Sequence, residues 1–236
     1  MRRFILVLGL LAFCAGLRVS AVPLLQLDIA GGTYDSSPDA ENIVSTSNPF
    51  TVQALFNTLS GTASGTYYLA VAIVPKTENP PLLDFGSFKI GDVTYSVDNM
   101  HYGTPPLAFG KSGDLASHGI YDTHYFEIGF MFDDENRANL YNSQDDPGGL
   151  VENEDGEILF HEFEVDVSGL SAGYQVHFDL YNLNTGKRGK PGVKDFAPFS
   201  HDAQSAPPSV ADTSSTMILL GMAMLAIEGL RRRFVR

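Results

Sequence analysis

The acidic segment between residues 133 and 155 holds the side chains best suited to binding a hard cation. Calcium takes about six to eight oxygen ligands, and the carboxylates and amides of one loop can supply several of them together. The candidate ligands are Asp133, Asp134, Asp145, Asp146, Glu152, Asn153 and Asp155. The Asp-x-Asp-x-Asp-Gly spacing of an EF-hand is missing. The composition resembles that of a calcium loop, but without the ligand spacing we expect a solvated surface loop and no cofactor, with calcium binding as the alternative.

Six histidines are a second source of metal ligands or of acid–base chemistry. They are His101, His118, His124, His161, His177 and His201. His177 and Asp179 alternate along one predicted strand and share the face that the pattern predicts to be wet. No His-x-x-x-His spacing occurs, so a transition-metal site rests on residue type alone. We expect these histidines to be exposed or hydrogen-bonded structural residues.

The sequence shows no arrangement typical of a hydrolase. Residues 61–65 are loop-like and form no serine elbow, while Ser200, His201 and Asp202 are adjacent in sequence. Catalytic triads are assembled across a fold, so adjacency gives no support. Carboxylates for glycoside cleavage are abundant, but no feature selects a pair. We therefore expect no enzymatic activity, with a jelly-roll hydrolase as an alternative.

Aromatic side chains offer a third chemistry, the stacking of sugar rings. The chain has 10 tyrosines and 16 phenylalanines but no tryptophan, which has the largest flat face. The tyrosines to test are Tyr67, Tyr68, Tyr95, Tyr102, Tyr121 and Tyr141. Core packing is the expectation for them, and a carbohydrate-binding module is an alternative function.

These residues must be positioned by β-strands, because the body shows period-2 hydrophobic alternation. Residues 50–56 and 174–180 alternate, which predicts one buried and one wet face for each strand. Residues 67–74 and 126–132 are more uniformly apolar, as in central strands. Between residues 158 and 167 the apolar phase slips at His161 and Glu162, which predicts a β-bulge. Phe196 and Phe199 are expected to pack a terminal strand or turn against the core.

The fold class that these patterns predict is all-β, an antiparallel β-sandwich of jelly-roll type. Clusters of glycine, proline and Asx residues separate the strands, and no part of the body shows a helical stripe. The expected organisation is a signal peptide at 1–21, a β-sandwich domain at 22–204, a linker and sorting motif at 205–215, a transmembrane helix at 216–230 and a basic cytoplasmic tail at 231–236.

The N-terminus has the pattern of a secretory signal peptide. Two arginines precede an apolar run at residues 4–17, and small residues follow it up to Ala21. Cleavage is expected between Ala21 and Val22. The only cysteine, Cys14, lies inside the removed segment, so the mature chain has no disulfide and no cysteine metal ligand.

The C-terminal tail has three zones in the order of a cell-surface sorting signal. A small polar motif is followed by an apolar segment and an arginine cluster. The motif is Val210, Ala211, Asp212, Thr213 and Ser214, and the cluster is Arg231, Arg232 and Arg233. The 14-residue, largely apolar segment 217–230 measures about 21 Å as a helix, short of a bilayer core of about 30 Å. Flanking arginines can compensate by snorkelling, and the positive-inside rule places the body outside. A permanent single-span anchor is the alternative.

The charge of the body is strongly negative. Residues 22–209 contain 8 basic and 26 acidic residues, a net charge of −18. Such a surface repels nucleic acid and anionic lipid and favours solubility and divalent cations. Nucleic acid is therefore excluded as a partner.

The tail resembles the PEP-CTERM class of sorting signals, in particular the variant with a Val-Pro-Asp-Ser-Gly motif. Val210 and Asp212 match it, whereas Ala211 replaces the proline, Thr213 the serine and Ser214 the glycine. The resemblance implies recognition by an exosortase, a membrane enzyme that removes the tail, after passage through the export translocon.

The body is similar to the family of choice-of-anchor N proteins, whose members carry differing C-terminal anchors. The residues that carry the resemblance are 25–28, 32–35, 50–52, 118–121, 176–181 and 196–203. The family implies no established biochemical activity. The expected function is an exported, membrane-anchored precursor that becomes a structural or adhesive cell-surface or matrix protein, with extracellular polysaccharide as an expected partner and a carbohydrate- or calcium-binding module as the alternative.

Overall fold

A computed structural model describes residues 21–37, 41–107, 113–116, 119–185 and 191–207 of the chain. The signal segment before Ala21, the sorting motif at 210–214 and the arginine cluster at 231–233 lie outside these ranges. Among the described residues, the structure contains no helix with the length and apolar character needed to cross a bilayer. The predictions for both ends of the chain remain predictions.

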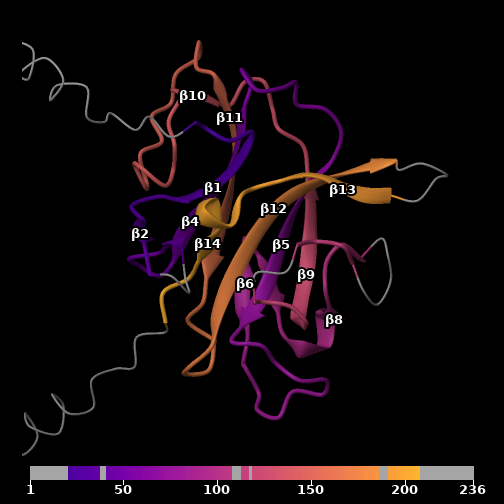
Figure 1. Cartoon of the computed structure of the whole chain (residues 1–236). Coiled ribbons are helices and arrows are strands. Elements are labelled where there is room, and N and C mark those ends of the chain that lie inside the picture. Colours follow the sequence, from indigo (N-terminus) through magenta and orange to yellow (C-terminus); the bar gives the residue numbers. More distant parts are fainter. Residues whose placement is uncertain (1–20, 38–40, 108–112, 117–118, 186–190, 208–236) are drawn as a thin grey trace, which may run out of the picture.

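The described chain folds into two sheets, one of six strands and one of eight (Figure 1). The first sheet has the order β1 (Leu25–Ile29), β4 (Phe50–Asn57), β11 (Ile158–Asp166), β6 (Phe88–Ile90) and β7 (Val93–Tyr95), and β10 (Arg137–Ala138) pairs with β11. The second has the order β2 (Thr33–Asp35), β3 (Asn42–Val44), β14 (Ala203–Gln204), β12 (Gln175–Thr185), β5 (Tyr67–Val74), β9 (Thr123–Phe130) and β8 (His101–Gly103), and β13 (Pro191–Phe196) pairs with β12. Two 3₁₀ turns, η2 (Val97–Asn99) and η5 (Phe199–His201), complete these elements.

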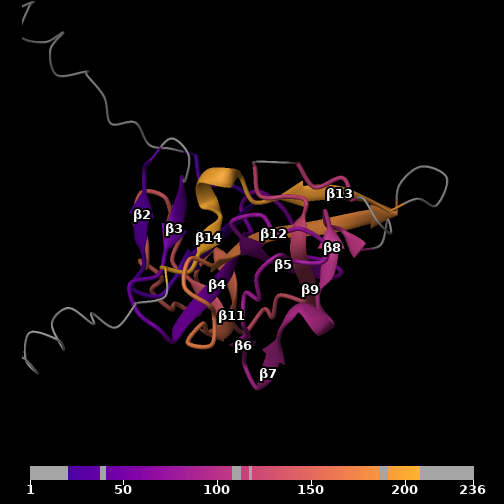
Figure 2. The ribbon, with the colours of Figure 1, turned by 90° about the horizontal axis from the view of Figure 1, so that it is seen from below.

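The two sheets pack face to face around one large core, as Figures 1 and 2 show from two directions. Leu27 and Val52 of the first sheet and Val71 and Phe178 of the second are all fully buried in this core. Almost all strand pairs are antiparallel, the exception being β3 with β14. The chain also passes from one sheet to the other between β4 and β5 and again between β11 and β12. The predicted all-β sandwich is confirmed.

Strands β4 and β12 show the predicted alternation, but the prediction of one wet face for each is wrong. On β4, Gln53 and Leu55 are buried as well as Val52 and Phe56. Leu55 belongs to a second apolar cluster on the outer face of the first sheet. That cluster contains Leu55, Ala138, Ile158 and Phe160, with Val22, Tyr141 and Leu150 packed against it. The segment between β10 and β11 thus covers a face that local pattern alone assigns to solvent.

The predicted bulge in the segment 158–167 is also wrong. Strand β11 pairs with β4 in an unbroken register from Ile158 opposite Asn57 to Val165 opposite Phe50. The apparent phase slip arises because both faces of β11 are buried near its start, where Ile158 and Phe160 point into the outer cluster. His161 takes an inward position and stacks on Phe130 at 4.8 Å between ring centroids.

The expectation that Phe196 and Phe199 pack against the core is not met. Their side chains are 43% and 36% exposed, and the two rings contact each other at a centroid distance of 6.0 Å. Ala197 between them is the buried residue of this segment. The chain therefore reaches η5 through a small residue rather than through an aromatic anchor.

Candidate metal centre

The pairing of β12 with β14 brings together polar residues that are far apart in sequence. His177 pairs with Gln204 and Phe178 with Ala203, so continuing the register by one residue places Asp202 opposite Asp179. Because alternate residues of a strand point to the same face, His177 and Asp179 share one face with Asp202 and Gln204. Phe178 points the other way, into the core between the sheets. Strand register therefore assembles the site.

We call His177, Asp179 and Asp202 the His177 cluster. Within the described part of the chain, it is the only group of three or more His, Cys, Asp or Glu side chains whose ligand atoms all lie within 4.8 Å of one another. His177 Nε2 lies 3.7 Å from Asp179 Oδ1 and 3.8 Å from Asp202 Oδ2. All three residues are buried, with 1% to 3% of their surface exposed. The prediction that His177 and Asp179 lie on a wet face is wrong.

The outer face of the second sheet is covered by the segment that leads into β9. Leu115 and Tyr121 from this segment form a cluster with Tyr125 and Tyr181 on that face. The hydroxyl of Tyr121 donates a hydrogen bond of 2.6 Å to Asp179 Oδ2. Burial, together with the charge of Asp179, raises the pKa of the Tyr121 hydroxyl well above its ordinary value, so it stays a donor. Burial and the charge of Asp179 also raise the pKa of Asp202 well above its usual range.

An imidazole nitrogen beside two carboxylates has two chemical uses in a buried site. It can share protons with the carboxylates, or the three groups can coordinate one first-row divalent metal ion, which accepts mixed nitrogen and oxygen ligands. The sequence reasoning considered His177 and Asp179 but missed Asp202, because only the pairing with β14 brings it near. Asp202 was noted from the sequence, but only as part of the adjacent residues Ser200, His201 and Asp202.

The adjacent residues Ser200, His201 and Asp202 do not form a catalytic triad, in agreement with the sequence analysis. His201 Nδ1 lies 2.9 Å from Ser200 Oγ, and its Nε2 lies 3.0 Å from Asn142 Oδ1. Burial lowers the pKa of His201 to about 4, so the ring is neutral and its Nε2–H donates to Asn142. Asp202 points instead to His177. His201 therefore anchors η5 to the segment that covers the first sheet.

The other histidines of the described ranges are not among the three members of the His177 cluster. His101 is exposed, whereas His124 is buried with its Nδ1 2.7 Å from Thr77 Oγ1. His161 is half-buried against the rings of Phe130 and Phe163. Burial lowers the pKa of His124 and of His161. His118 lies outside the described residues.

The seven predicted calcium ligands are spread over separate turns. Asp133 and Asp134 lie in the turn before β10, where Asp134 binds Arg137 at 3.2 Å. Glu152, Asn153 and Asp155 lie in the turn before β11, and Glu152 and Asn153 line, with Arg137, a hollow of about 260 Å³. The Arg137 guanidinium donates to the carbonyls of Asp134 and Gly156, so a cation of the protein already stands among these oxygens. Asp145 and Asp146 belong to a third turn, closed on Asn142. The structure does not gather the seven residues at one point.

A third buried carboxylate, that of Asp28 on β1, was not predicted from the sequence to be part of a site. It accepts hydrogen bonds from the backbone of Ile29 at 2.7 Å, from the backbone of Gly148 at 2.8 Å and from the hydroxyl of Tyr141 at 2.7 Å. Gln26, on the same face of β1, accepts from the backbone of Ser143 at 3.0 Å. These contacts fix the segment between β10 and β11, called the covering segment below, over the first sheet. Desolvation outweighs the donors and raises the pKa of Asp28 to about 6.

This shift predicts a pH dependence of stability. Between about pH 4 and pH 6 the folded state keeps a proton on Asp28 that the unfolded state has lost, so raising the pH through this window destabilises the fold. We expect the stability of the wild type relative to Asp28→Asn to fall by up to about 3 kcal/mol from pH 4 to pH 7. Urea unfolding of both proteins across this range measures the difference. A constant difference would contradict the assignment.

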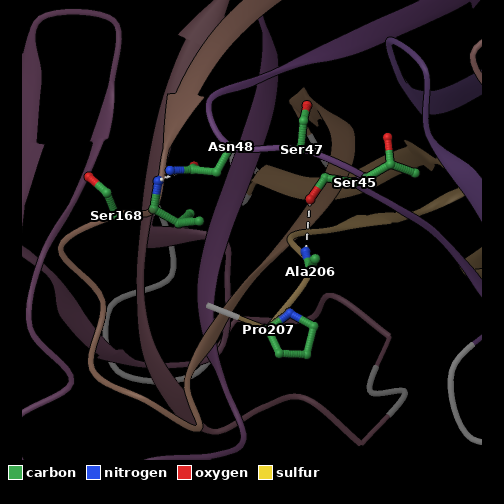
Figure 3. A pocket seen from close by; sticks show the side chains of 8 residues that line it. Ser45, Ser47, Asn48, Ser168, Ala206 and Pro207 are labelled. Atoms are coloured by element: carbon green, nitrogen blue, oxygen red, sulfur yellow. Dashed lines mark hydrogen bonds between the residues drawn. The ribbon is translucent and has the colours of Figure 1, made fainter. Parts of the chain in front are cut away.

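A polar hollow lies where the described chain ends (Figure 3). It measures about 440 Å³ and is lined by Ser45, Thr46, Ser47, Asn48, Val167, Ser168, Ala206 and Pro207. Ser45 Oγ accepts a hydrogen bond from the Ala206 backbone, and Asn48 Oδ1 accepts one from the Val167 backbone. None of the lining side chains is ionisable, so this hollow offers no acid–base pair for catalysis.

The six candidate sugar-binding tyrosines are mostly not on the surface. Tyr67 and Tyr121 are buried, and Tyr68, Tyr95 and Tyr141 are half-buried. Tyr102 is exposed, at 37%. The structure therefore does not assemble them into a flat aromatic platform, and core packing accounts for most of them.

Comparisons with known proteins add a limited result. No protein-family model matches the chain, and no curated protein matches it. Among solved structures, the chain is similar to the collagen-binding subdomain of the surface protein ACE of Enterococcus faecalis, at 8% identity and a TM-score of 0.25, over 78% of this chain and 97% of that one. At this TM-score the similarity carries no argument about function. The fold and the cluster thus define an all-β sandwich with a buried histidine–carboxylate group.

Proposed function

We propose that this chain is an exported protein of the cell surface or extracellular matrix, with a structural or adhesive rather than an enzymatic role. The observation that carries the proposal is the arrangement of the sequence. An acidic, cysteine-free body stands between two apolar segments that are each flanked by arginines. Such ends direct a chain into and across a membrane, and such a body suits an oxidising exterior because no thiol is exposed to oxidation.

The described body supports the non-enzymatic part of the proposal. The polar side chains around Asp28 and in the His177 cluster are buried, and they connect segments that are distant in sequence. The hollow beside Pro207 is lined by hydroxyl, amide and apolar side chains without an ionisable group. Acid–base and nucleophilic catalysis both need such a group within reach of the substrate. A domain built in this way serves as a scaffold or contact surface.

The tail supports a more specific proposal, which is removal by an exosortase-type enzyme. The motif at Val210–Ser214 precedes the apolar segment and the cluster at Arg231–Arg233, which is the order of the sorting signals that the tail resembles. Extracellular polysaccharide is the partner class we propose for the released body. An acidic surface stays soluble at the cell exterior and does not bind anionic lipid.

Mass spectrometry of the protein recovered from its native envelope tests the proposal by reading both ends. We expect an N-terminus at Val22 and a C-terminus between Ser209 and Ser214. An N-terminus at Val22 with an intact Arg236 would support export but contradict removal of the tail. A soluble intracellular chain with Met1 and Arg236 both intact would overturn the proposal.

A further inference from the structure

The His177 cluster has ligand separations that suit one bound ion. Its distances of 3.7 Å and 3.8 Å from His177 Nε2 to the two carboxylates exceed the length of a hydrogen bond, which is about 2.7 to 3.2 Å. Two ligand atoms about 2.1 Å from one zinc ion are about 3.4 Å apart at the tetrahedral angle and about 3.7 Å apart at about 125°. The separations therefore fit a shared ion better than direct contact.

The orientation of the His177 ring is defined by its second nitrogen. His177 Nδ1 lies 3.4 Å from Gln204 Oε1, on the side of the ring away from the two carboxylates. Asn42 Nδ2 donates to the same oxygen at 3.3 Å and fixes the orientation of the Gln204 amide. With Nδ1 facing Gln204, Nε2 faces Asp179 and Asp202. Metal-bound histidines show this arrangement, in which the second nitrogen donates to an outer acceptor.

The charge of the cluster also favours a cation. The cluster places one imidazole and two carboxyl groups in a buried site, where a divalent cation would offset the cost of ionising both carboxyl groups. The Tyr121 hydroxyl orients Asp179 through its hydrogen bond to Oδ2, which leaves Oδ1 toward His177. Ligating carboxylates are commonly held by such an outer donor.

We propose that His177, Asp179 and Asp202 bind one divalent first-row transition metal, zinc being the first choice. An imidazole with two carboxylates matches the ligand preference of zinc, whereas calcium needs about six to eight oxygens. Three protein ligands leave a coordination position for water or another group. The ion joins β12 to Asp202, 23 residues after Asp179, and so holds the last described segment in the second sheet. This site is independent of export.

Zinc titration of the untagged full-length chain, purified in detergent and stripped with a chelator, tests the proposal. We expect one zinc per chain by elemental analysis, and a melting temperature that rises with zinc and falls again with chelator. Cobalt(II) in place of zinc should give d–d absorption bands. A wild-type chain that binds no zinc and no cobalt would overturn the proposal.

Substitutions in and around the His177 cluster test which side chains bind the zinc ion. Asp202→Asn and His177→Gln are expected to abolish stoichiometric binding, and Tyr121→Phe to weaken it by about 10- to 100-fold as an outer-donor variant. The matched controls are Asp133→Asn with Asp155→Asn in the acidic turns and His101→Gln on the surface, all expected to bind like the wild type. Retained binding in folded Asp202→Asn, or loss in the acidic-turn variant, would contradict the assignment. Circular dichroism identifies any variant that fails to fold. If a ligand variant fails to fold, the zinc affinity of Tyr121→Phe tests the assignment instead.

Discussion

Replacing Asp28 by alanine is expected to lower the free energy of unfolding by about 3 to 5 kcal/mol. The carboxylate accepts from the backbones of Ile29 and Gly148 and from the Tyr141 hydroxyl. Alanine leaves these donors without their acceptor in a buried place, and each unsatisfied donor costs about 1 to 3 kcal/mol. Water entering the space left by the carboxyl group offsets part of the cost. The effect is large because one side chain holds the covering segment on β1.

Equilibrium urea unfolding of the full-length chain measures this loss. Asp145→Ala is the matched control, since its side chain is exposed in the same covering segment, and we expect a change within about 0.5 kcal/mol. Hydrogen exchange adds a local readout, because the backbone amide of Gly148 should lose protection in Asp28→Ala. A loss below about 1 kcal/mol for Asp28→Ala would show that Asp28 does not fix this segment.

Replacing Phe178 by alanine is expected to cost about 3 to 5 kcal/mol. Phe178 is fully buried between the two sheets and meets Phe50 edge to face at 6.2 Å between ring centroids. The substitution removes the apolar contacts of the ring and leaves a cavity between two sheets that cannot collapse onto it. Because Phe178 faces away from His177 and Asp179, the ligands themselves are not altered.

Two measurements separate the packing role of Phe178 from the metal centre. Phe196→Ala removes a ring that is 43% exposed and is expected to cost less than about 1 kcal/mol. Phe178→Leu keeps most of the volume and should retain one zinc per chain, if the proposed centre is correct. A loss of unfolding free energy of about 3 kcal/mol or more in Phe196→Ala would contradict the arrangement of the core. A negligible loss in Phe178→Ala would contradict it as well.

Local pattern predicted which segments become strands but not which of their faces are covered. The alternation at residues 50–56 and 174–180 reports that one face is strongly apolar, and those faces do form the core. The opposite faces carry Gln53, His177 and Asp179, which look like surface residues in a local window yet are buried. Asp179 is held by Tyr121, 58 residues before it, and His177 lies beside Asp202 and Gln204 of another segment. A local pattern contains no information about such distant contacts.

The sequence by itself determined the class of fold and the acidic character of the body, because period-2 alternation and net charge are local or additive properties. Tertiary structure alone decided where the polar chemistry meets. Asp202 reaches His177 through the register of β12 with β14, and Asp28 reaches Gly148 across 120 residues. The parallel pairing of β14 with β3 adds a further constraint of this kind. Such contacts depend on which strands pair and in what register, and that choice is made by the packing of the whole chain.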